Sequence, residues 1–528
     1  MPRPKKDKTK KAKVMRASAA RGRPKATKSF ATQQSLNGAV KTICDIMRRS
    51  NCAGAMQYVP ELTWILFLRI LDERETHEAE AAEAVGADFT PSLKAPFRWQ
   101  DWAAPEGKKR KQLSAGALGA FFGFVNGELL PHLKRLEHRP NATPRQKVIS
   151  EIMSGVDRVR IDTERNLLDI LDKVHEISTE RVDDTHIFTL SQIYEGLLLK
   201  MGEKGNDGGQ FFTPREMIRV MTQIADPKVG ETVYDPCCGT GGFLAQAFEY
   251  VEGRLGARAT ANELETLKRR MFYGREKENL IYPIGLANLV LHGIDEPHLW
   301  HGNTLTGQEI YGGLFQDAPA QHDVILTNPP FGGKEGKDAQ TRFAFKTSAT
   351  QVLFLQHVID SLKTGGRCAI VLDEGVLFRT NENAFLQVKR KLLDECEVSC
   401  IVSLPAGAFV NAGAGVKTNL AFFVKGRPTE RIWYYDLSGV KVGKKNPLTA
   451  ASFAEFLELY PKRTDGERSW TVERAAIEAK GYDLKAVNPN AKSNEDVRTP
   501  SELIAEIEAR SLEIGAAIGE LRTLLERR

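Results

Sequence analysis

Between about residue 205 and about residue 425, short β-rich runs alternate with segments of helical periodicity, and this alternation constrains the fold most. The runs lie at residues 232–234, 323–326, 368–372, 398–404 and 420–424. Such alternation is typical of a mostly parallel sheet that is covered by helices on both faces. We therefore expect a Rossmann-like α/β fold, in which ligands bind beyond the carboxyl ends of the strands.

The segments on either side of this α/β region, which we assign to residues 191–430, have other patterns. Residues 29–190 carry apolar residues at helical spacing and no chemical motif, so we expect an all-helical N-terminal domain. Residues 431–495 are expected to form a mixed extension. Residues 496–528 should form a C-terminal helix, because apolar side chains recur there at helical spacing. This helix either binds a partner or packs on its own domain.

Positive charge is concentrated at the N-terminus. Residues 1–28 hold twelve Lys or Arg and one Asp, so the other residues together carry a net charge of −5 within the total of +6. We expect this basic tail to be disordered, because it has almost nothing to bury. Within it, Arg-Gly-Arg-Pro-Lys at residues 21–25 resembles the core of an AT-hook, a peptide that lies in the minor groove of DNA. We favour the alternative, a solubilising or generally phosphate-seeking tail.

Composition argues against several classes of protein. No stretch approaches the roughly 18 unbroken apolar residues of a membrane span, and the N-terminus lacks the apolar core of a signal peptide. We therefore expect no membrane contact. The seven cysteines are scattered without a zinc-binding spacing, so we also expect a cytoplasmic protein with no metal. Cys396 and Cys400 would share a face if they were helical, but the sequence offers no second ligand pair.

A Gly-rich turn follows the first of the β-rich runs. Residues 233–244 read Val-Tyr-Asp-Pro-Cys-Cys-Gly-Thr-Gly-Gly-Phe-Leu, with an acid at the strand end and a helix after the glycines. The glycines permit tight turning and close approach of a ligand to the backbone. The turn lacks the Lys-Ser/Thr of a phosphate loop. Its acid would repel a pyrophosphate but suit the cationic amino group of S-adenosylmethionine, although a plain strand–helix turn can have the same pattern.

A second motif, Asn328-Pro329-Pro330-Phe331, ends the run at residues 323–326. Two prolines cannot continue a central ladder, so the chain must leave the sheet at its carboxyl edge. An exocyclic base amine is a poor nucleophile, because its lone pair is delocalised into the ring. Acceptors on its two N–H bonds, the Asn328 side-chain carbonyl and the Pro329 backbone carbonyl, would turn the lone pair toward a methyl donor. Phe331 would supply a face on which a flipped base can stack.

Together these motifs resemble those of amino-group DNA methyltransferases. Residues 209–216, Gly-Gln-Phe-Phe-Thr-Pro-Arg-Glu, narrow the resemblance to the methylation subunit of type I restriction–modification systems. Further family motifs are matched at residues 273–276, 286–294, 366–378 and 404–419. The resemblance implies the class I S-adenosylmethionine-dependent methyltransferase fold. It also implies site-specific transfer of a methyl group from S-adenosylmethionine to N6 of adenine, which protects host DNA.

The resemblance assigns roles to single residues. Asn328, Pro329, Pro330 and Phe331 would form the catalytic site and hold the adenine. Within the donor pocket, Asp235 and the glycines after it would hold the methionine part of the donor, and Glu276 its ribose hydroxyls. The family usually has Asp where this chain has Asn303, so we expect weaker cofactor binding. The full set of cofactor contacts is expected to be Gln210, Phe212, Thr213, Pro214, Asp235, Gly239, Thr240, Gly241, Glu276, Asn303 and Leu305.

The resemblance further implies an assembly in the bacterial cytoplasm, associated with the nucleoid. Expected partners are double-stranded DNA, a specificity subunit and a restriction subunit, with two copies of this chain per specificity subunit. The mildly acidic body agrees with DNA affinity that is borrowed from a partner. Two alternatives remain: a non-catalytic DNA-binding structural subunit that keeps the fold, and a protein glutamine N-methyltransferase, since a carboxamide nitrogen poses the same lone-pair problem.

Overall fold

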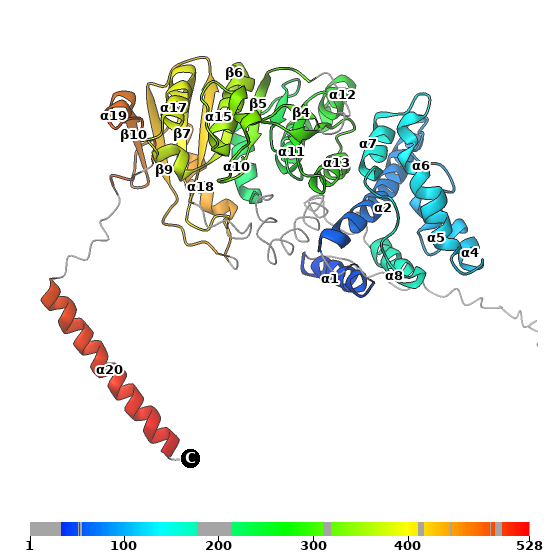
Figure 1. The fold of residues 1–528 in the computed structure, drawn as a ribbon, viewed down its shortest axis with the longest axis horizontal. Coiled ribbons are helices and arrows are strands. Elements are labelled where there is room, and N and C mark those ends of the chain that lie inside the picture. Colours follow the sequence, from blue (N-terminus) through cyan, green and yellow to red (C-terminus); the bar gives the residue numbers. More distant parts are fainter. Residues whose placement is uncertain are drawn as a thin grey trace, which may run out of the picture.

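The computed structural model describes residues 33–50, 52, 55–176, 213–309, 318–409, 417–443, 446–485, 487–490 and 499–526 (Figure 1). We call residues 33–176 the helical unit and residues 213–490 the sheet unit. The basic tail, Gln210 and Phe212 lie outside the described residues.

The described part of the helical unit contains helices and no strands, as the periodicity predicted. Its core is rich in large aromatic side chains, and Trp64, Trp99, Trp102, Phe121 and Phe124 are almost fully buried. The helices are α1 (Gln33–Arg49), α2 (Ala55–Ala84), α3 (Trp99–Trp102), α4 (Lys108–Ser114), α5 (Ala120–Phe124), α6 (Leu130–Lys134), α7 (Pro144–Met153) and α8 (Glu164–His175), with short π and 3-10 turns between α5 and α7.

The sheet unit is built on one mixed sheet with the strand order β10-β9-β7-β8-β6-β5-β1-β2-β3-β4. Strands β3, β2, β1, β5 and β6 are parallel to one another, and β8 inserts antiparallel between β6 and β7. The strands are β1 (Val233–Asp235), β2 (Phe272–Glu276), β3 (His298–Asn303), β4 (Gln308–Glu309), β5 (His322–Thr327), β6 (Leu362–Asp373), β7 (Cys396–Ser403), β8 (Thr418–Lys425), β9 (Arg431–Asp436) and β10 (Ser469–Glu473). The predicted α/β class is confirmed.

Helices cover both faces of this sheet. Successive side chains of each strand point to opposite faces, so they pack into two separate apolar cores, one on each side. In β5, Val324 and Leu326 join one core and Ile325 joins the other. The first core is closed by α10 (Arg215–Ala225), α11 (Gly242–Leu255), α13 (Ile281–His292) and α18 (Ala450–Leu459). The second is closed by α15 (Thr350–Ser361), α16 (Glu374–Phe378), α17 (Asn383–Glu395) and α19 (Arg474–Ala479). Two shorter helices, α12 (Ala261–Arg269) and α14 (Lys337–Arg342), complete the unit.

The sheet does not stop at residue 430. The segment that we expected to be a mixed extension, residues 431–495, adds β9 and β10 to the same sheet. Strand β9 is buried over its four central residues, so it shows no polar–apolar alternation by which the sequence could reveal it.

Helix α13 joins the helical unit to the sheet unit, because α2 and α7 both pack against it. Charged side chains reinforce this contact. The Arg145 guanidinium lies 2.8 Å from the Asp295 carboxylate and 2.7 Å from that of Glu78, and the Arg145 side chain is only 13% exposed. Arg74 donates to the Val290 carbonyl in the last turn of α13. The two units therefore share one continuous apolar core.

The C-terminal helix α20 (Pro500–Glu526) stands away from both units (Figure 1). Its apolar side chains face solvent: Ile507 is 65% exposed and Leu512 76%. No helix in the described parts of the chain is long and apolar enough to cross a membrane.

Candidate active site

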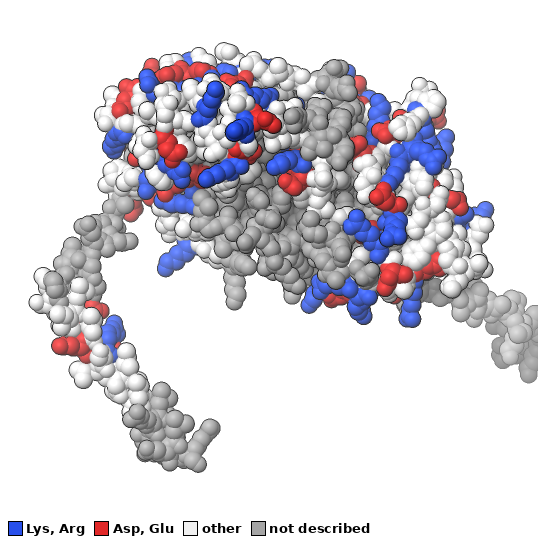
Figure 2. All heavy atoms as spheres, in the orientation of Figure 1, with Lys and Arg blue, Asp and Glu red and all other residues white. Residues whose placement is uncertain are grey.

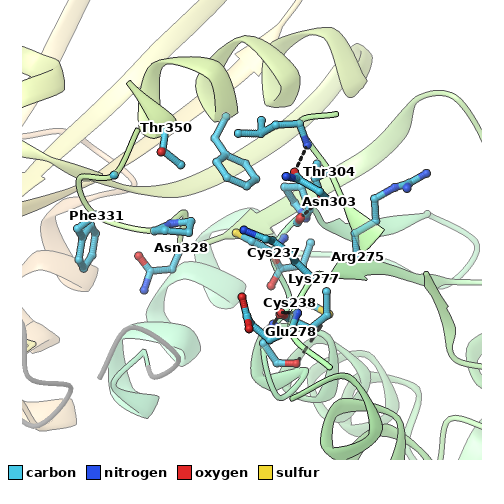
Figure 3. Close-up of a pocket in the computed structure, with 18 of the residues that line it drawn as sticks. Cys237, Cys238, Arg275, Lys277, Glu278, Asn303, Thr304, Asn328, Phe331 and Thr350 are labelled. Carbon is cyan, nitrogen blue, oxygen red and sulfur yellow. Dashed lines mark hydrogen bonds between the residues drawn. The ribbon is translucent and has the colours of Figure 1, made fainter. Parts of the chain in front are cut away.

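The carboxyl ends of β1, β2, β3 and β5 surround a cavity of about 290 Å³ (Figure 3). This is where a ligand of a parallel sheet is expected to bind. Ten of the residues that the sequence predicted for the site line the cavity: Thr213, Asp235, Gly239, Thr240, Glu276, Asn303, Leu305, Asn328, Pro330 and Phe331. The folded sheet thus brings together motifs that are far apart in the chain.

The Gly-rich turn joins β1 to α11 in a conformation that requires glycine. Gly239 and Gly241 have φ values of 54° and 79°, in the left-handed region. A Cβ on Gly241 would lie 3.0 Å from the Leu289 side chain of α13, which would have to shift to accept it. Asn288 of α13 donates from Nδ2 to the Thr240 carbonyl at 2.9 Å. The turn is therefore held in place by α13, and its backbone lines the cavity.

Asp235 ends β1, lines the cavity and is 1% exposed. Its Oδ1 accepts from the Thr327 hydroxyl at 2.8 Å and from the Cys237 N–H at 3.1 Å. Burial raises the pKa of this carboxyl to about 7, although the two hydrogen bonds lower it.

Glu276 ends β2 on the other side of the Gly-rich turn. Its two carboxylate oxygens accept from the Gly239 N–H at 2.9 Å and from the Glu278 N–H at 2.8 Å. Burial raises the pKa of Glu276 to about 7, and its charge also raises the pKa of Asp235. Neither carboxylate has a basic partner within the described ranges. The cavity thus holds two buried acids that a cationic ligand would stabilise.

Asn303 closes the same cavity at the end of β3 (Figure 3). Its Oδ1 accepts from the Leu305 N–H at 2.9 Å, which turns the chain beneath the cavity. An amide oxygen has two lone pairs, so one remains for a ligand donor. A carboxylate in this place would accept more strongly.

Asn328 lies across the cavity from Asn303, at the end of β5 (Figure 3). Its Nδ2 donates to the Thr213 hydroxyl at 2.9 Å. Its Oδ1 is inaccessible to solvent and has no hydrogen-bond partner among the residues that the structure describes. Because a buried acceptor without a donor is unfavourable, this atom points to a ligand that donates a hydrogen bond.

The prolines and Phe331 continue this loop. Pro329 is buried, and its carbonyl accepts from Gln351 Nε2 at 3.2 Å. The Phe331 ring is half-buried and packs edge-to-face on Phe409, with ring centroids 5.0 Å apart. The aromatic ring therefore has a fixed support beside the cavity.

Three other predicted residues in the described ranges do not line the cavity. Pro214 caps the N-terminus of α10, Gly241 caps that of α11, and Pro329 is buried behind its neighbours. Conversely, the sequence did not single out several lining residues. Some of these lining residues lie within or next to the motifs. Thr350 and Phe354 belong instead to α15, which carries no motif and comes next to the cavity only when the chain folds. The lining residues that were missed include Cys237, Cys238, Arg275, Lys277, Glu278, Thr350 and Phe354.

No metal centre accompanies the cavity in the described residues, which contain no group of three or more His, Cys, Asp or Glu that could hold a metal ion. Cys396 and Cys400 both lie in strand β7, not in a helix, and both are buried.

Comparison with known proteins identifies two family matches. A profile of the N-6 DNA methylase family matches residues 185–497, and one of the HsdM N-terminal domain matches residues 36–174. The EcoEI type I restriction enzyme methylase subunit of Escherichia coli is 34% identical over 93% of this chain and 98% of its own length. The EcoKI methylase subunit of E. coli K12 is 30% identical over 82% of this chain and 79% of its own.

Solved structures of type I restriction–modification proteins are also similar to this chain. A crystallised modification subunit from Vibrio vulnificus YJ016 superposes with a TM-score of 0.76 at 32% identity, over 88% of this chain and 99% of its own. A chain from an assembled type I restriction–modification system gives a TM-score of 0.67 at 36% identity, over 94% of this chain and 99% of its own. The chain belongs to the N-6 DNA methylase family and, within it, to the methylase subunits of type I restriction enzymes.

Proposed function

We propose that the cavity binds S-adenosylmethionine and that the Asn328 loop presents N6 of a DNA adenine to it. The activity is that of an adenine-specific DNA methyltransferase, the modification subunit of a type I restriction–modification system. The donor supplies a methyl group that its sulfonium has already activated. The protein therefore has to place the two reactants in line rather than provide a nucleophile.

The donor set of the cavity suits S-adenosylmethionine, which carries positive charge on its sulfonium and its amino group. Asp235 would hold the amino group, and the Gly-rich turn would follow the methionine part. Glu276 would accept from the ribose hydroxyls, and Asn303 from the adenine amino group. Both buried acids would regain a counter-charge or a donor on binding.

The target adenine must leave the duplex to reach this cavity. Asn328 Oδ1 and the Pro329 carbonyl would each accept one N–H of the amino group, which draws its nitrogen toward tetrahedral geometry. Phe331, braced by Phe409, would stack on the base. The observation that supports this proposal most strongly is the buried Asn328 Oδ1, which has no donor among the residues that the structure describes.

Substitution of Asn328 tests the assignment in the purified complex with its partner subunits. We expect Asn328→Ala to bind S-adenosylmethionine as the parent does, and to lose methyl transfer to DNA by about 10²-fold or more. Asn328→Asp keeps an acceptor and should lose less. Equal transfer by the alanine variant and the parent would contradict the assignment.

We also propose that the chain works with other subunits on host DNA in the bacterial cytoplasm. On the face drawn in Figure 2, acidic and basic side chains are interspersed over the sheet unit rather than gathered into one basic patch. DNA affinity would then come largely from a specificity subunit, with two copies of this chain on each, and cleavage from a restriction subunit. Helix α20 is our candidate for docking to the specificity subunit, because its apolar side chains are exposed.

A further inference from the structure

The N-terminal end of α15 supports the Asn328 loop from behind. Gln351 is 3% exposed, and its Nε2 donates to the Pro329 carbonyl at 3.2 Å. Its Oε1 accepts from the Asp373 N–H at 2.8 Å. One buried amide therefore joins the loop after β5 to the carboxyl end of β6, the next strand in the sheet.

The same helix end holds the far side of the loop. Thr350 donates from its hydroxyl to Glu335 Oε1 at 3.0 Å, and the Glu335 N–H donates to the Ser348 carbonyl at 2.8 Å. A Cβ on Gly333 would come within 2.9 Å of the Thr350 hydroxyl, so the loop lies directly against the helix here. Figure 3 shows Thr350 beside the loop that carries Asn328 and Phe331.

The loop needs such support, because two consecutive prolines deprive it of backbone donors. Pro329 and Pro330 have no N–H, so this stretch can be held by hydrogen bonds only through its carbonyls. A carbonyl oxygen has two lone pairs. Gln351 occupies one lone pair of the Pro329 carbonyl, and no other donor to this oxygen is found in the described part of the chain. Pro329 itself does not line the cavity, so a target amine would approach the second lone pair between Asn328 and Pro330, which do.

We propose that Gln351 is a positioning residue for methyl transfer, which fixes the Pro329 carbonyl where it accepts from the target amino group. This inference rests on the proposed function, since it assigns Gln351 through the acceptor that it holds. Gln351 itself would touch neither the donor nor the base. Its loss should therefore lower kcat without changing the affinity for S-adenosylmethionine.

The same helix offers a matched control. Gln356 is also buried, at 1% exposed, and also makes an amide clamp: its Nε2 donates to the Phe345 carbonyl at 3.0 Å, and its Oε1 accepts from the Phe345 N–H at 2.9 Å. It holds a segment that does not line the cavity. Gln351→Leu and Gln356→Leu thus remove the same kind of interaction from one helix.

We would measure kcat on DNA and the Kd for S-adenosylmethionine in the full complex. We expect Gln351→Leu to lower kcat by about 10²-fold, as for a reacting group displaced by an ångström, with Kd unchanged. Gln356→Leu should keep the kcat of the parent, even if both variants lower the melting temperature. Equal kcat values for the two variants, or a Kd that rises with the fall in kcat, would overturn the proposal.

The variant Gln351→Glu tests the role of Gln351 in a second way, because a residue that only stabilises the fold would not make the relative kcat depend on pH. The protonated acid donates its O–H to the Pro329 carbonyl and still accepts from the Asp373 N–H, whereas the carboxylate repels that carbonyl. With saturating donor, the ratio of variant to parent kcat should rise as pH falls. The nearby Glu335, Asp373 and Glu374 are present in both proteins, so their titration cancels in the ratio. A ratio that does not change with pH would contradict the proposal.

The adenine site and the role of Gln351 can be disproved separately. If Asn328→Ala methylates DNA as the parent does, the proposed adenine site is wrong, and the role of Gln351 is lost with it. If Asn328→Ala is inactive while Gln351→Leu matches Gln356→Leu, the adenine site stands and only the role of Gln351 is wrong.

Discussion

At the scale of single residues, the site is defined by polar groups that the protein leaves incompletely satisfied. Within the described ranges, Asp235 and Glu276 are buried acids without a counter-charge, and Asn328 Oδ1 is a buried acceptor without a donor. Each is unfavourable in the unliganded protein and is compensated by one part of the proposed reactants. The proposed ligands therefore follow from the counter-charges and the hydrogen-bond donor that these side chains lack.

Cofactor affinity should depend on pH through Asp235 and Glu276. The pKa of each carboxyl is raised to about 7, so both are largely protonated at pH 6 and ionised at pH 8. Since the cationic donor binds the ionised form, its Kd should rise as pH falls through 7, by about tenfold per pH unit for each carboxyl that must ionise. Calorimetric titration at pH 6, 7 and 8 measures this dependence. Asp235→Asn should bind more weakly and with a shallower pH dependence, and an equal Kd at pH 6 and 8 in the parent would contradict the account.

Asn303 should limit the affinity for the donor. Asn303→Asp keeps an acceptor for the Leu305 N–H and adds a charged acceptor for the donor's adenine amino group. Hydrogen bonds to charged groups contribute about 1 kcal/mol more than neutral ones, so Kd should fall by about fivefold. Titration at pH 8 tests this, and a weaker-binding aspartate variant would show that Asn303 does not contact the donor in this way.

At the scale of elements, the sequence predicted those parts of the fold whose residues are apolar and consecutive. The central strands β1 and β5 and the later strands β6, β7 and β8 were found because they are buried runs. Strand β2 was recognised only as the motif at residues 273–276 and β3 only through Asn303 at its end, because Arg275, His298 and His301 interrupt their apolar residues. Strand β4 has only two residues, and β10 lies at the sheet edge with little apolar pattern.

The residues of the site also divide into those that a local sequence pattern reveals and those that it does not. Acids and glycines at strand ends are visible in the sequence, because strand, turn and helix follow one another there. Gln351 and Thr350 were not predicted, since a helix residue acquires a role at the site only when the sheet brings β5 and α15 together. Contacts of this kind depend on tertiary packing, which a local pattern does not encode.

The Gly-rich turn should tolerate no side chain at Gly241. Gly241→Ala places a Cβ at 3.0 Å from Leu289 and forces a non-glycine residue to φ 79°. The left-handed conformation alone costs about 1–2 kcal/mol. We expect a lower melting temperature and weaker donor binding, measured by thermal unfolding with and without S-adenosylmethionine. Gly253→Ala, in α11 with open space around it, is the control: it should keep donor binding and keep or raise the melting temperature, because Ala is more favourable than Gly inside a helix.

At the scale of the whole molecule, the helical unit and the sheet unit should unfold together because charged side chains bridge them at α13. Arg145→Ala removes one of the two arginines that pair with both Glu78 and Asp295, and leaves them only Arg74. Hydrogen bonds to charged groups contribute about 1.5–3 kcal/mol, so we expect the free energy of unfolding to fall by about 2 kcal/mol for this partly buried contact. The urea midpoint should fall accordingly. Arg254→Ala, which removes an exposed pair with Asp226, should leave it unchanged.

Helix α20 should connect the chain to its assembly without contributing to the site. A chain that ends before residue 500 should bind S-adenosylmethionine with the affinity of the full chain and fail to co-purify with the specificity subunit. Its exposed apolar residues, such as Ile507 and Leu512, would be the first to replace with Ser. Full co-purification of the shortened chain would place the docking surface elsewhere.

Sequencing of host DNA for modified adenine tests most directly whether this chain methylates adenine in DNA. The chain would be co-expressed with its partner subunits. The account predicts N6-methyladenine at one specific sequence in cells with the parent chain and none in cells with Asn328→Ala. Absence of modified adenine in both, with a complex that still binds S-adenosylmethionine, would contradict the assignment of adenine in DNA as the methyl acceptor.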